Sequence, residues 1–269
     1  MKIHLSGCDI LFAKSIELAA KLILTVLVSA VLSSCVPSAK VPLDTIMYPQ
    51  EKGNLQECLV IFLPGRGSRA AEFEREGFIE RIRQSGLKAD AVAAELHLGY
   101  YANWTAVERL RHDVIATAHA QGYKSVWLVG ISMGGLGALE YARNYPGEVA
   151  GIVLLAPYVG DDEIINEIIQ AGGLEAWTPG PIAELDYQRR LWTWIRDYKM
   201  QRLSRPVIYL GYGLDDRFVE ADHLLASAIG PHRTMTVPGG HTWTTWKVLW
   251  KSLEGRISCS GNMQDKIGR

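Results

Sequence analysis

The chain has almost no excess charge and lacks several motifs that identify common ligand-binding proteins. Its 269 residues include 28 Lys and Arg against 29 Asp and Glu, a formal net charge of −1. Such a balance gives no indication of a nucleic-acid partner or of a basic membrane-binding surface. There is no Gly-x-x-x-x-Gly-Lys phosphate loop, no Cys-x-x-Cys pair, no internal repeat and no low-complexity tract. With 48% hydrophobic and 21% charged residues, the composition is that of one ordinary globular domain.

A long hydrophobic run is also missing, because the apolar segment Leu22–Leu32 has only eleven uncharged residues. That is too short to span a bilayer but is typical of a signal peptide. Leu32-Ser33-Ser34-Cys35 follows directly and resembles a bacterial lipobox, in which cleavage precedes a cysteine that is then diacylated. The resemblance implies a signal peptide over 1–34 and a lipid anchor at Cys35. Val36, in place of Asp, favours the periplasmic side of the outer membrane. An ordinary secretory peptide or an uncleaved anchor remains an alternative.

Cysteines are few, and only Cys58 and Cys259 remain downstream of Cys35. An even pair in an exported protein predicts a disulfide. Cys58 begins a predicted strand and Cys259 follows the last predicted helix, so both are expected at the lower edge of a sheet. Two unpaired thiols are the alternative.

Predicted strands and helices alternate along most of the chain. Strands are expected at 45–48, 58–63, 89–98, 125–129, 150–156, 206–213 and in a short segment from 234; helices are expected at 70–85, 104–121 and 136–145. This alternation predicts parallel strands joined by helices. Ligands bind such sheets at the carboxyl ends of the strands.

The most informative motif is Gly130-Ile131-Ser132-Met133-Gly134, which follows the apolar run 126–129 and precedes a predicted helix. Strand, sharp turn and helix would place the serine at the apex, where a nucleophile needs a fixed and accessible position. The bare pattern is a weak signal, so its structural context must decide.

Two further segments carry aspartates and a histidine downstream of the serine. Asp215 and Asp216 follow the predicted strand 206–213, and His241 follows a glycine pair after the last short strand. With the loop Leu63-Pro64-Gly65-Arg66-Gly67, these motifs resemble the α/β-hydrolase superfamily over about residues 45–256. The resemblance implies an α/β-hydrolase fold with a mostly parallel central sheet flanked by helices.

The same resemblance implies roles for individual residues. Ser132 would be the nucleophile, His241 the base that takes its proton, and Asp216 the carboxylate that orients the imidazole. Asp215 is the alternative to Asp216, although the spacing Gly-x-x-Asp-x-x-Val favours Asp216.

The oxyanion hole would consist of the backbone N–H groups of Arg66 and Met133. Attraction of an anionic substrate group by the Arg66 side chain is one interpretation, but such an arginine is more often solvated or paired with a surface carboxylate. Tyr100, Tyr101 and Trp104 follow a predicted strand and either line the mouth of the site or pack in the core.

Residues 161–204 interrupt the alternation with two predicted helices, 162–171 and 185–200, and three tryptophans, Trp177, Trp192 and Trp194. We expect a small helical lid that touches substrate; a helix pair on the flank, with the tryptophans as core, is the alternative. The expected organisation is a signal peptide (1–34), a tether (35–44), a hydrolase domain (45–257) and a tail (258–269).

The predicted function is therefore a serine hydrolase that cleaves carboxylic esters or thioesters of a small acyl substrate through an acyl-enzyme. No metal or organic cofactor is implied. An acyltransferase would use the same triad, and a non-catalytic, lipid-anchored binding protein on this fold is the third possibility. The sequence leaves the oligomeric state open.

Overall fold

The computed structural model describes residue 21 and residues 37–51, 56–200 and 206–259. The chain divides into two compact units, residues 1–38 and 39–269, and every element below belongs to the second. The expected signal peptide (apart from Lys21), Cys35 and the tail beyond Cys259 lie outside the described residues, so those expectations remain predictions. None of the helices in the described ranges combines the length and the apolar character that a bilayer crossing requires.

Seven strands form one sheet in the order β1-β3-β2-β4-β5-β6-β7. Their bounds are β1 (Thr45–Tyr48), β2 (Cys58–Leu63), β3 (Asp90–Ala94), β4 (Ser125–Ile131), β5 (Gly151–Leu155), β6 (Val207–Gly213) and β7 (Thr234–Val237). The strand β1 pairs antiparallel with β3, and all other neighbours are parallel. The prediction of a mostly parallel sheet is confirmed.

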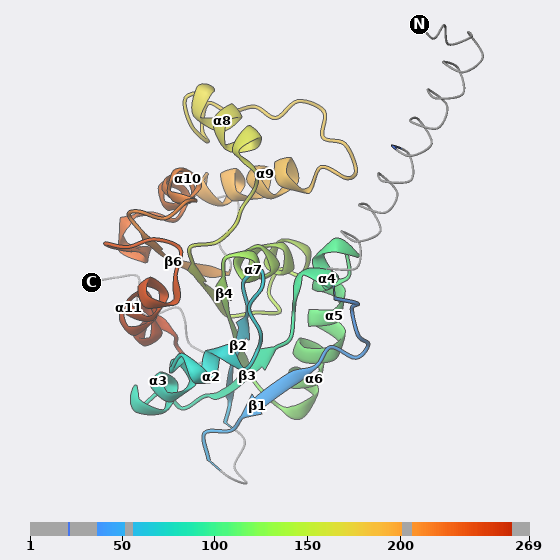
Figure 1. The fold of residues 1–269 in the computed structure, drawn as a ribbon, viewed down its shortest axis with the longest axis vertical. Coiled ribbons are helices and arrows are strands. Elements are labelled where there is room, and N and C mark those ends of the chain that lie inside the picture. The colour runs from blue at the N-terminus through green and yellow to red at the C-terminus, as the bar shows by residue number, and fades with distance from the viewer. Residues whose placement is uncertain (1–20, 22–36, 52–55, 201–205, 260–269) are drawn as a thin grey trace, which may run out of the picture. The chain divides into compact units, whose positions relative to one another are not determined.

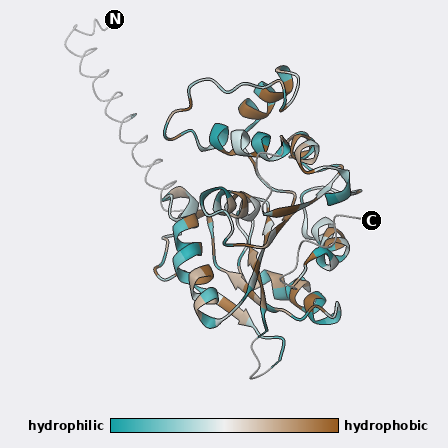
Figure 2. Cartoon of the chain, turned by 180° about the vertical axis from the view of Figure 1, so that it is seen from behind, coloured by the Kyte–Doolittle hydropathy of each residue, from teal (hydrophilic) through white to brown (hydrophobic). Residues whose placement is uncertain are grey.

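Helices cover both faces of this sheet, whereas α8 lies apart from it at the top of the view (Figure 1). The α-helices of the described residues are α2 (Glu72–Arg75), α3 (Phe78–Gln84), α4 (Leu98–Ala102), α5 (Ala106–Arg109), α6 (Ala116–Gln121), α7 (Met133–Asn144), α8 (Asp162–Gln170), α9 (Tyr187–Lys199), α10 (Val219–Ile229) and α11 (Trp243–Leu253). The helix α11 packs against α3, where the rings of Trp250 and Phe78 stack with centroids 5.6 Å apart. Hydrophobic residues gather on the central strands and hydrophilic residues on the outer helix surfaces (Figure 2).

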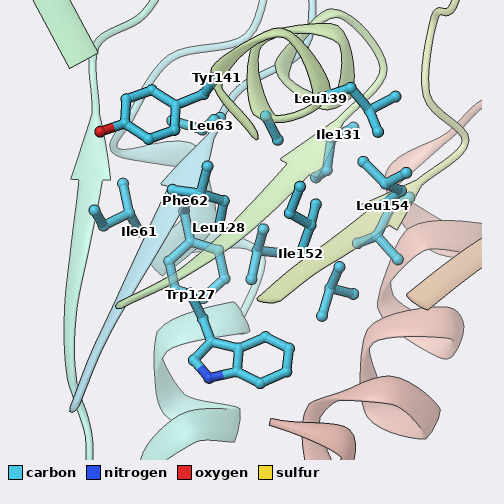
Figure 3. Packing of buried hydrophobic residues seen from close by; sticks show 14 of the residues in the cluster. Ile61, Phe62, Leu63, Trp127, Leu128, Ile131, Leu139, Tyr141, Ile152 and Leu154 are labelled. Atoms are coloured by element: carbon cyan, nitrogen blue, oxygen red, sulfur yellow. The ribbon is translucent and has the colours of Figure 1, made fainter. Parts of the chain in front are cut away.

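The core explains why the central strands carry unbroken apolar runs instead of an alternating pattern. Every residue of β2, β4 and β5 is buried, because helices cover both sides of these strands. Figure 3 shows Phe62, Trp127 and Leu128 packed with Ile152, beneath Leu139 of α7. This packing fixes the carboxyl ends of the three strands relative to one another.

Several expected boundaries are wrong, each for a local reason. The single helix expected at 70–85 is two short helices separated by Gly77, which has a φ of +82°. The strand expected at 89–98 ends at Ala94, because His97 caps α4 by accepting a hydrogen bond at Nδ1 from the Gly99 amide (3.1 Å). The helical stretch expected from residue 104 begins after Trp104, whose φ is +58°, and contains a π-helical segment, Leu110–Ile115.

A disulfide joins Cys58, at the start of β2, to Cys259, with their Cα atoms 5.3 Å apart. The indole of Trp127 also donates a hydrogen bond to the carbonyl oxygen of Ser258 (3.1 Å). These two contacts attach the segment that follows α11 to the amino-terminal edge of β2 and β4.

Candidate active site

Ser132 lies in a strained turn between β4 and α7. Its φ of +52° is a conformation that residues with a Cβ atom rarely adopt. Glycines on either side make the turn possible: a Cβ on Gly130 would lie 2.6 Å from the Gly135 nitrogen, and one on Gly134 would lie 2.9 Å from the Pro64 oxygen. The pattern Gly-x-Ser-x-Gly is therefore required by the close approach of β4, α7 and the loop after β2.

Backbone hydrogen bonds hold this turn in place. The Ser132 amide donates to the carbonyl oxygen of Leu155 (3.0 Å), and the Ser132 carbonyl accepts from the Tyr158 amide (3.0 Å). Ser132 is only 4% exposed, yet it lines the main pocket. A hydroxyl in such a position is fixed and open to a ligand on one side.

The loop after β2 packs directly against the serine. A Cβ added to Gly65 would lie 3.2 Å from the Ser132 Cβ. Among the hydrogen bonds of the described residues, the amides of Arg66 and Met133 have no acceptor. Met133 is the first residue of α7, where the backbone N–H groups lack partners within the helix. Both residues that the sequence predicts as oxyanion donors thus lie beside Ser132 with unused amides.

The structure brings Asp216 and His241 together. The imidazole Nδ1 lies 3.0 Å from Oδ1 and 2.9 Å from Oδ2 of Asp216. The Asp216 side chain is fully buried, and its Oδ1 also accepts a hydrogen bond from the Phe218 amide (3.0 Å). Asp215, the alternative, is exposed and instead accepts a hydrogen bond from the Gly239 amide (3.2 Å).

Close backbone contact positions these two side chains. A Cβ on Gly213 would lie 2.8 Å from the Gly239 carbonyl carbon and 3.0 Å from the Thr245 side chain. The loops after β6 and β7 can therefore touch only because residue 213 is glycine. That contact places residue 216 within reach of residue 241.

Two aromatic rings enclose the imidazole edge-on. The rings of Phe218 and Trp246 each lie 5.0 Å from the His241 ring, at 83° and 89°. Phe218 also lines the pocket that contains Ser132, so it connects the histidine to the serine side of the site. The hydrogen bonds of the described residues include none between the Ser132 hydroxyl and the imidazole. Catalytic hydrogen bonds are often long without substrate and shorten in the substrate complex.

The pocket above Ser132 has a volume of about 740 Å³. One wall is a face of α7 and the opposite wall comes from α4, α5 and the residues between them. Asp161, Tyr187 and Arg190, from the segment between β5 and β6, complete it. The pocket is therefore a groove that begins at the serine and continues along α7.

The segment 161–204 has features of both predicted arrangements, the lid that touches substrate and the helix pair with a tryptophan core. Tyr187 and Arg190 line the pocket, while Trp177 and Trp192 are buried core residues and do not line it. Trp194 is half-buried against the core. The helix α9 packs against α10 and α7. The tryptophans therefore stabilise the insertion, and other residues of it face the ligand space.

Of the three aromatic residues expected near the mouth, Tyr101 and Trp104 line the pocket. Tyr100 does not, because its buried hydroxyl donates a hydrogen bond to the Lys40 carbonyl (3.0 Å). Sequence reasoning missed Tyr158, Arg217 and Phe218. Each follows the end of β5 or β6 by a few residues, so their place at carboxyl ends of parallel strands was the available signal.

No group of three His, Cys, Asp or Glu side chains within the described ranges is arranged to hold a metal ion. The chemistry of the site is that of a hydroxyl, an imidazole, a carboxylate and two backbone amides. These are the parts of an acyl-transfer site.

Residues 59–203, more than half of the chain, match the model of the serine aminopeptidase, S33 family. The chain belongs to this family of hydrolases. No curated protein matches the hydrolase significantly in sequence.

Solved structures share the fold of the hydrolase at low identity. An S-formylglutathione hydrolase from Agrobacterium tumefaciens is 14% identical with a TM-score of 0.58, over 82% of this chain and 92% of that one. A ferulic acid esterase is 15% identical with a TM-score of 0.56, over 81% and 92%. The fluorophosphonate-binding serine hydrolase FphF of Staphylococcus aureus is 14% identical with a TM-score of 0.56, over 80% and 98%. These likenesses establish the α/β-hydrolase fold of the chain.

Proposed function

We propose that this serine hydrolase cleaves carboxylic esters, thioesters included, through an acyl-enzyme on Ser132. The observation that carries the proposal is the buried Asp216 carboxylate on Nδ1 of His241, at the same edge of the sheet as the strained Ser132 turn. That hydrogen bond leaves Nε2 as the basic nitrogen of the imidazole. Two structural neighbours, an S-formylglutathione hydrolase and a ferulic acid esterase, support thioester and ester substrates for this chain.

In the proposed reaction, Ser132 Oγ attacks the substrate carbonyl while His241 accepts the hydroxyl proton. The negative oxygen of the tetrahedral intermediate would accept hydrogen bonds from the amides of Arg66 and Met133. His241 then protonates the departing alcohol or thiol, and the acyl group remains on the serine. Water, deprotonated by His241, releases the acid and restores the hydroxyl.

Location is a separate proposal. We propose that the chain is exported and attached to the membrane by lipid at Cys35, on the periplasmic side of the outer membrane. The lipobox-like Leu32-Ser33-Ser34-Cys35 and the short apolar segment before it support this proposal.

The catalytic proposal is tested with the purified chain, a fluorophosphonate probe and 4-nitrophenyl acyl esters. We expect Ser132→Ala to lose labelling and to reduce kcat/KM by about 10⁴-fold or more. Ser252→Ala, at an exposed serine on α11, is the matched control and should keep both. Turnover by Ser132→Ala at the wild-type rate would refute the proposal.

A second pair of variants separates the two aspartates. Asp216→Asn removes the carboxylate that holds the imidazole and should lower kcat by orders of magnitude. Asp215→Asn changes only the exposed residue bonded to Gly239 and should have little effect on kcat. An aminoacyl 4-nitroanilide in the same panel tests amide cleavage, the activity for which the family is named.

A further inference from the structure

Charged side chains of both signs surround the groove that begins at Ser132. The pocket is lined by four arginines and three carboxylates: Arg66, Arg143, Arg190, Arg217, Glu108, Glu140 and Asp161. Which of these charges is available to a ligand depends on the partners that each already has.

All three carboxylates already have partners, although Oε1 of Glu140 is buried without a hydrogen bond among the described residues. Glu140 forms an ion pair with Arg143 (2.7 Å), and Glu108 forms one with Arg109 (3.2 Å). Asp161 accepts hydrogen bonds from the hydroxyl of Tyr158 and from Nε2 of Gln188. These interactions reduce the capacity of the carboxylates to bind a cationic substrate.

Two of the arginines are also engaged. Arg143 holds Glu140, and Arg190 donates hydrogen bonds to the carbonyl oxygens of Ala183 and Glu184. Arg143 is therefore bound to a residue of α7, and Arg190 is bound to the backbone of the insertion.

The side chains of Arg66 and Arg217 have neither a hydrogen bond nor an ion pair within the part of the chain that the structure describes, whereas Arg190, which also lacks a carboxylate partner, is held by two carbonyl oxygens. Arg66 belongs to the loop that packs on Ser132, and Arg217 lies between Asp216 and Phe218. The Arg217 guanidinium lies 4.8 Å from the centre of the Phe218 ring. Both side chains are exposed and line the same pocket as the serine. The guanidinium groups that remain available to a ligand thus come from two different loops, one of which packs on Ser132.

Between Ser132 and Glu140 the groove also has apolar lining. Leu136 and Gly137 of α7 contribute to it, as do Leu98 and Val107. From Met133 to Glu140 the helix rises about 10 Å, so the apolar stretch has room for several carbon atoms in line. The pocket therefore combines two available guanidinium groups with an apolar stretch along α7, which ends at the charged residues Glu140 and Arg143.

We propose that the natural substrate is an anionic ester or thioester, with a carboxylate or phosphate group bound by Arg66 and Arg217. Its apolar part would lie in the groove along α7. Guanidinium groups bind such oxyanions through paired, charge-assisted hydrogen bonds, which makes arginine suited to this task. The proposal rests on the proposed esterase function and adds the charge of the substrate to it.

The test uses two esters that differ in charge and by one methyl group: mono-4-nitrophenyl adipate, which carries a free carboxylate, and its neutral methyl ester. The quantity of interest is the ratio of kcat/KM for the anionic ester to that for the neutral ester. Arg217→Gln should lower this ratio about five- to tenfold, and Arg66→Gln, which retains the backbone amide, should lower it in the same direction. Arg256→Gln, at an exposed arginine that does not line the pocket, is the control for net charge and should leave the ratio unchanged.

Salt provides an independent readout. Raising ionic strength screens exposed charges, so the ratio should fall in the wild type and fall less in Arg217→Gln, which keeps Arg66. A phosphate-bearing 4-nitrophenyl ester, compared in the same way, distinguishes carboxylate from phosphate.

Failure of the anionic substrate and failure of the esterase function give different results. If Ser132 is needed for turnover but neither arginine variant changes the ratio, the anionic substrate is excluded and the esterase function stands. If no ester is cleaved in a Ser132-dependent reaction, the esterase function itself fails, and the proposal fails with it.

Discussion

Loss of the Cys58–Cys259 disulfide should greatly destabilise the fold. The two cysteines are 201 positions apart, so the bond closes almost the whole hydrolase domain into one loop. In the chain-entropy model, a loop of that length corresponds to about 5 kcal/mol of stability. Domains of this kind are stable by only about 5–15 kcal/mol, so this contribution is a large part of the total.

The assay is urea unfolding of the wild type and of Cys259→Ser, each with and without a thiol-free reductant. Cys259 is the better position because it is half-buried, whereas a serine at the fully buried Cys58 would place a hydroxyl in the apolar core. We expect reductant to lower the wild-type midpoint to that of the variant and to leave the variant unchanged. Oxidised wild type whose bond is verified by mass spectrometry, yet which unfolds at the variant's midpoint, would refute the reasoning.

The remaining predictions concern a buried acid and the lipid anchor. Asp222 on α10 is fully buried, and neither of its carboxylate oxygens has a hydrogen-bond partner among the described residues. Burial, and secondly the nearby charge of Asp216, raise the pKa of Asp222 well above its ordinary value. The folded state therefore binds the extra proton, and stability falls as the pH rises above the unfolded pKa of about 3.9. Asp222→Asn should remove this loss, so its unfolding midpoint should gain on the wild type between pH 4 and 8; a constant difference would contradict the prediction. For the anchor, globomycin should block processing at Cys35, and Cys35→Ala should release the chain from membranes; a mature wild-type form without lipid would contradict it.

Most of the sheet was predictable because its central strands are long apolar runs. Buried parallel strands such as β2 and β4 need apolar residues on both faces, and short runs of this kind with β-branched residues favour strands. Element ends were less predictable. The break at Gly77 and the early end of β3 depend on single caps and on one backbone conformation, which periodicity does not encode.

The positions of Ser132, Asp216 and His241 followed from chain order and strand ends. The choice between Asp215 and Asp216 needed coordinates, since adjacent residues differ only in the direction of their side chains. The pocket walls were harder to predict. As aromatic residues, Trp177 and Trp192 were compatible with ligand contacts, but both are buried in the core.

The glycines around Ser132 tolerate less substitution than the residues that line the groove. At Gly65, Gly130 and Gly134, neighbouring backbone or the serine itself fills the space that a side chain would need, so mutation there would disturb the reaction centre directly. The groove beyond it is lined by α4, α5 and the insertion. Among the described residues, none of these elements forms a hydrogen bond with the side chain of Asp216 or His241. Descendants of this chain could therefore acquire new substrate preferences by altering those walls while the chemistry at the turn stays constant.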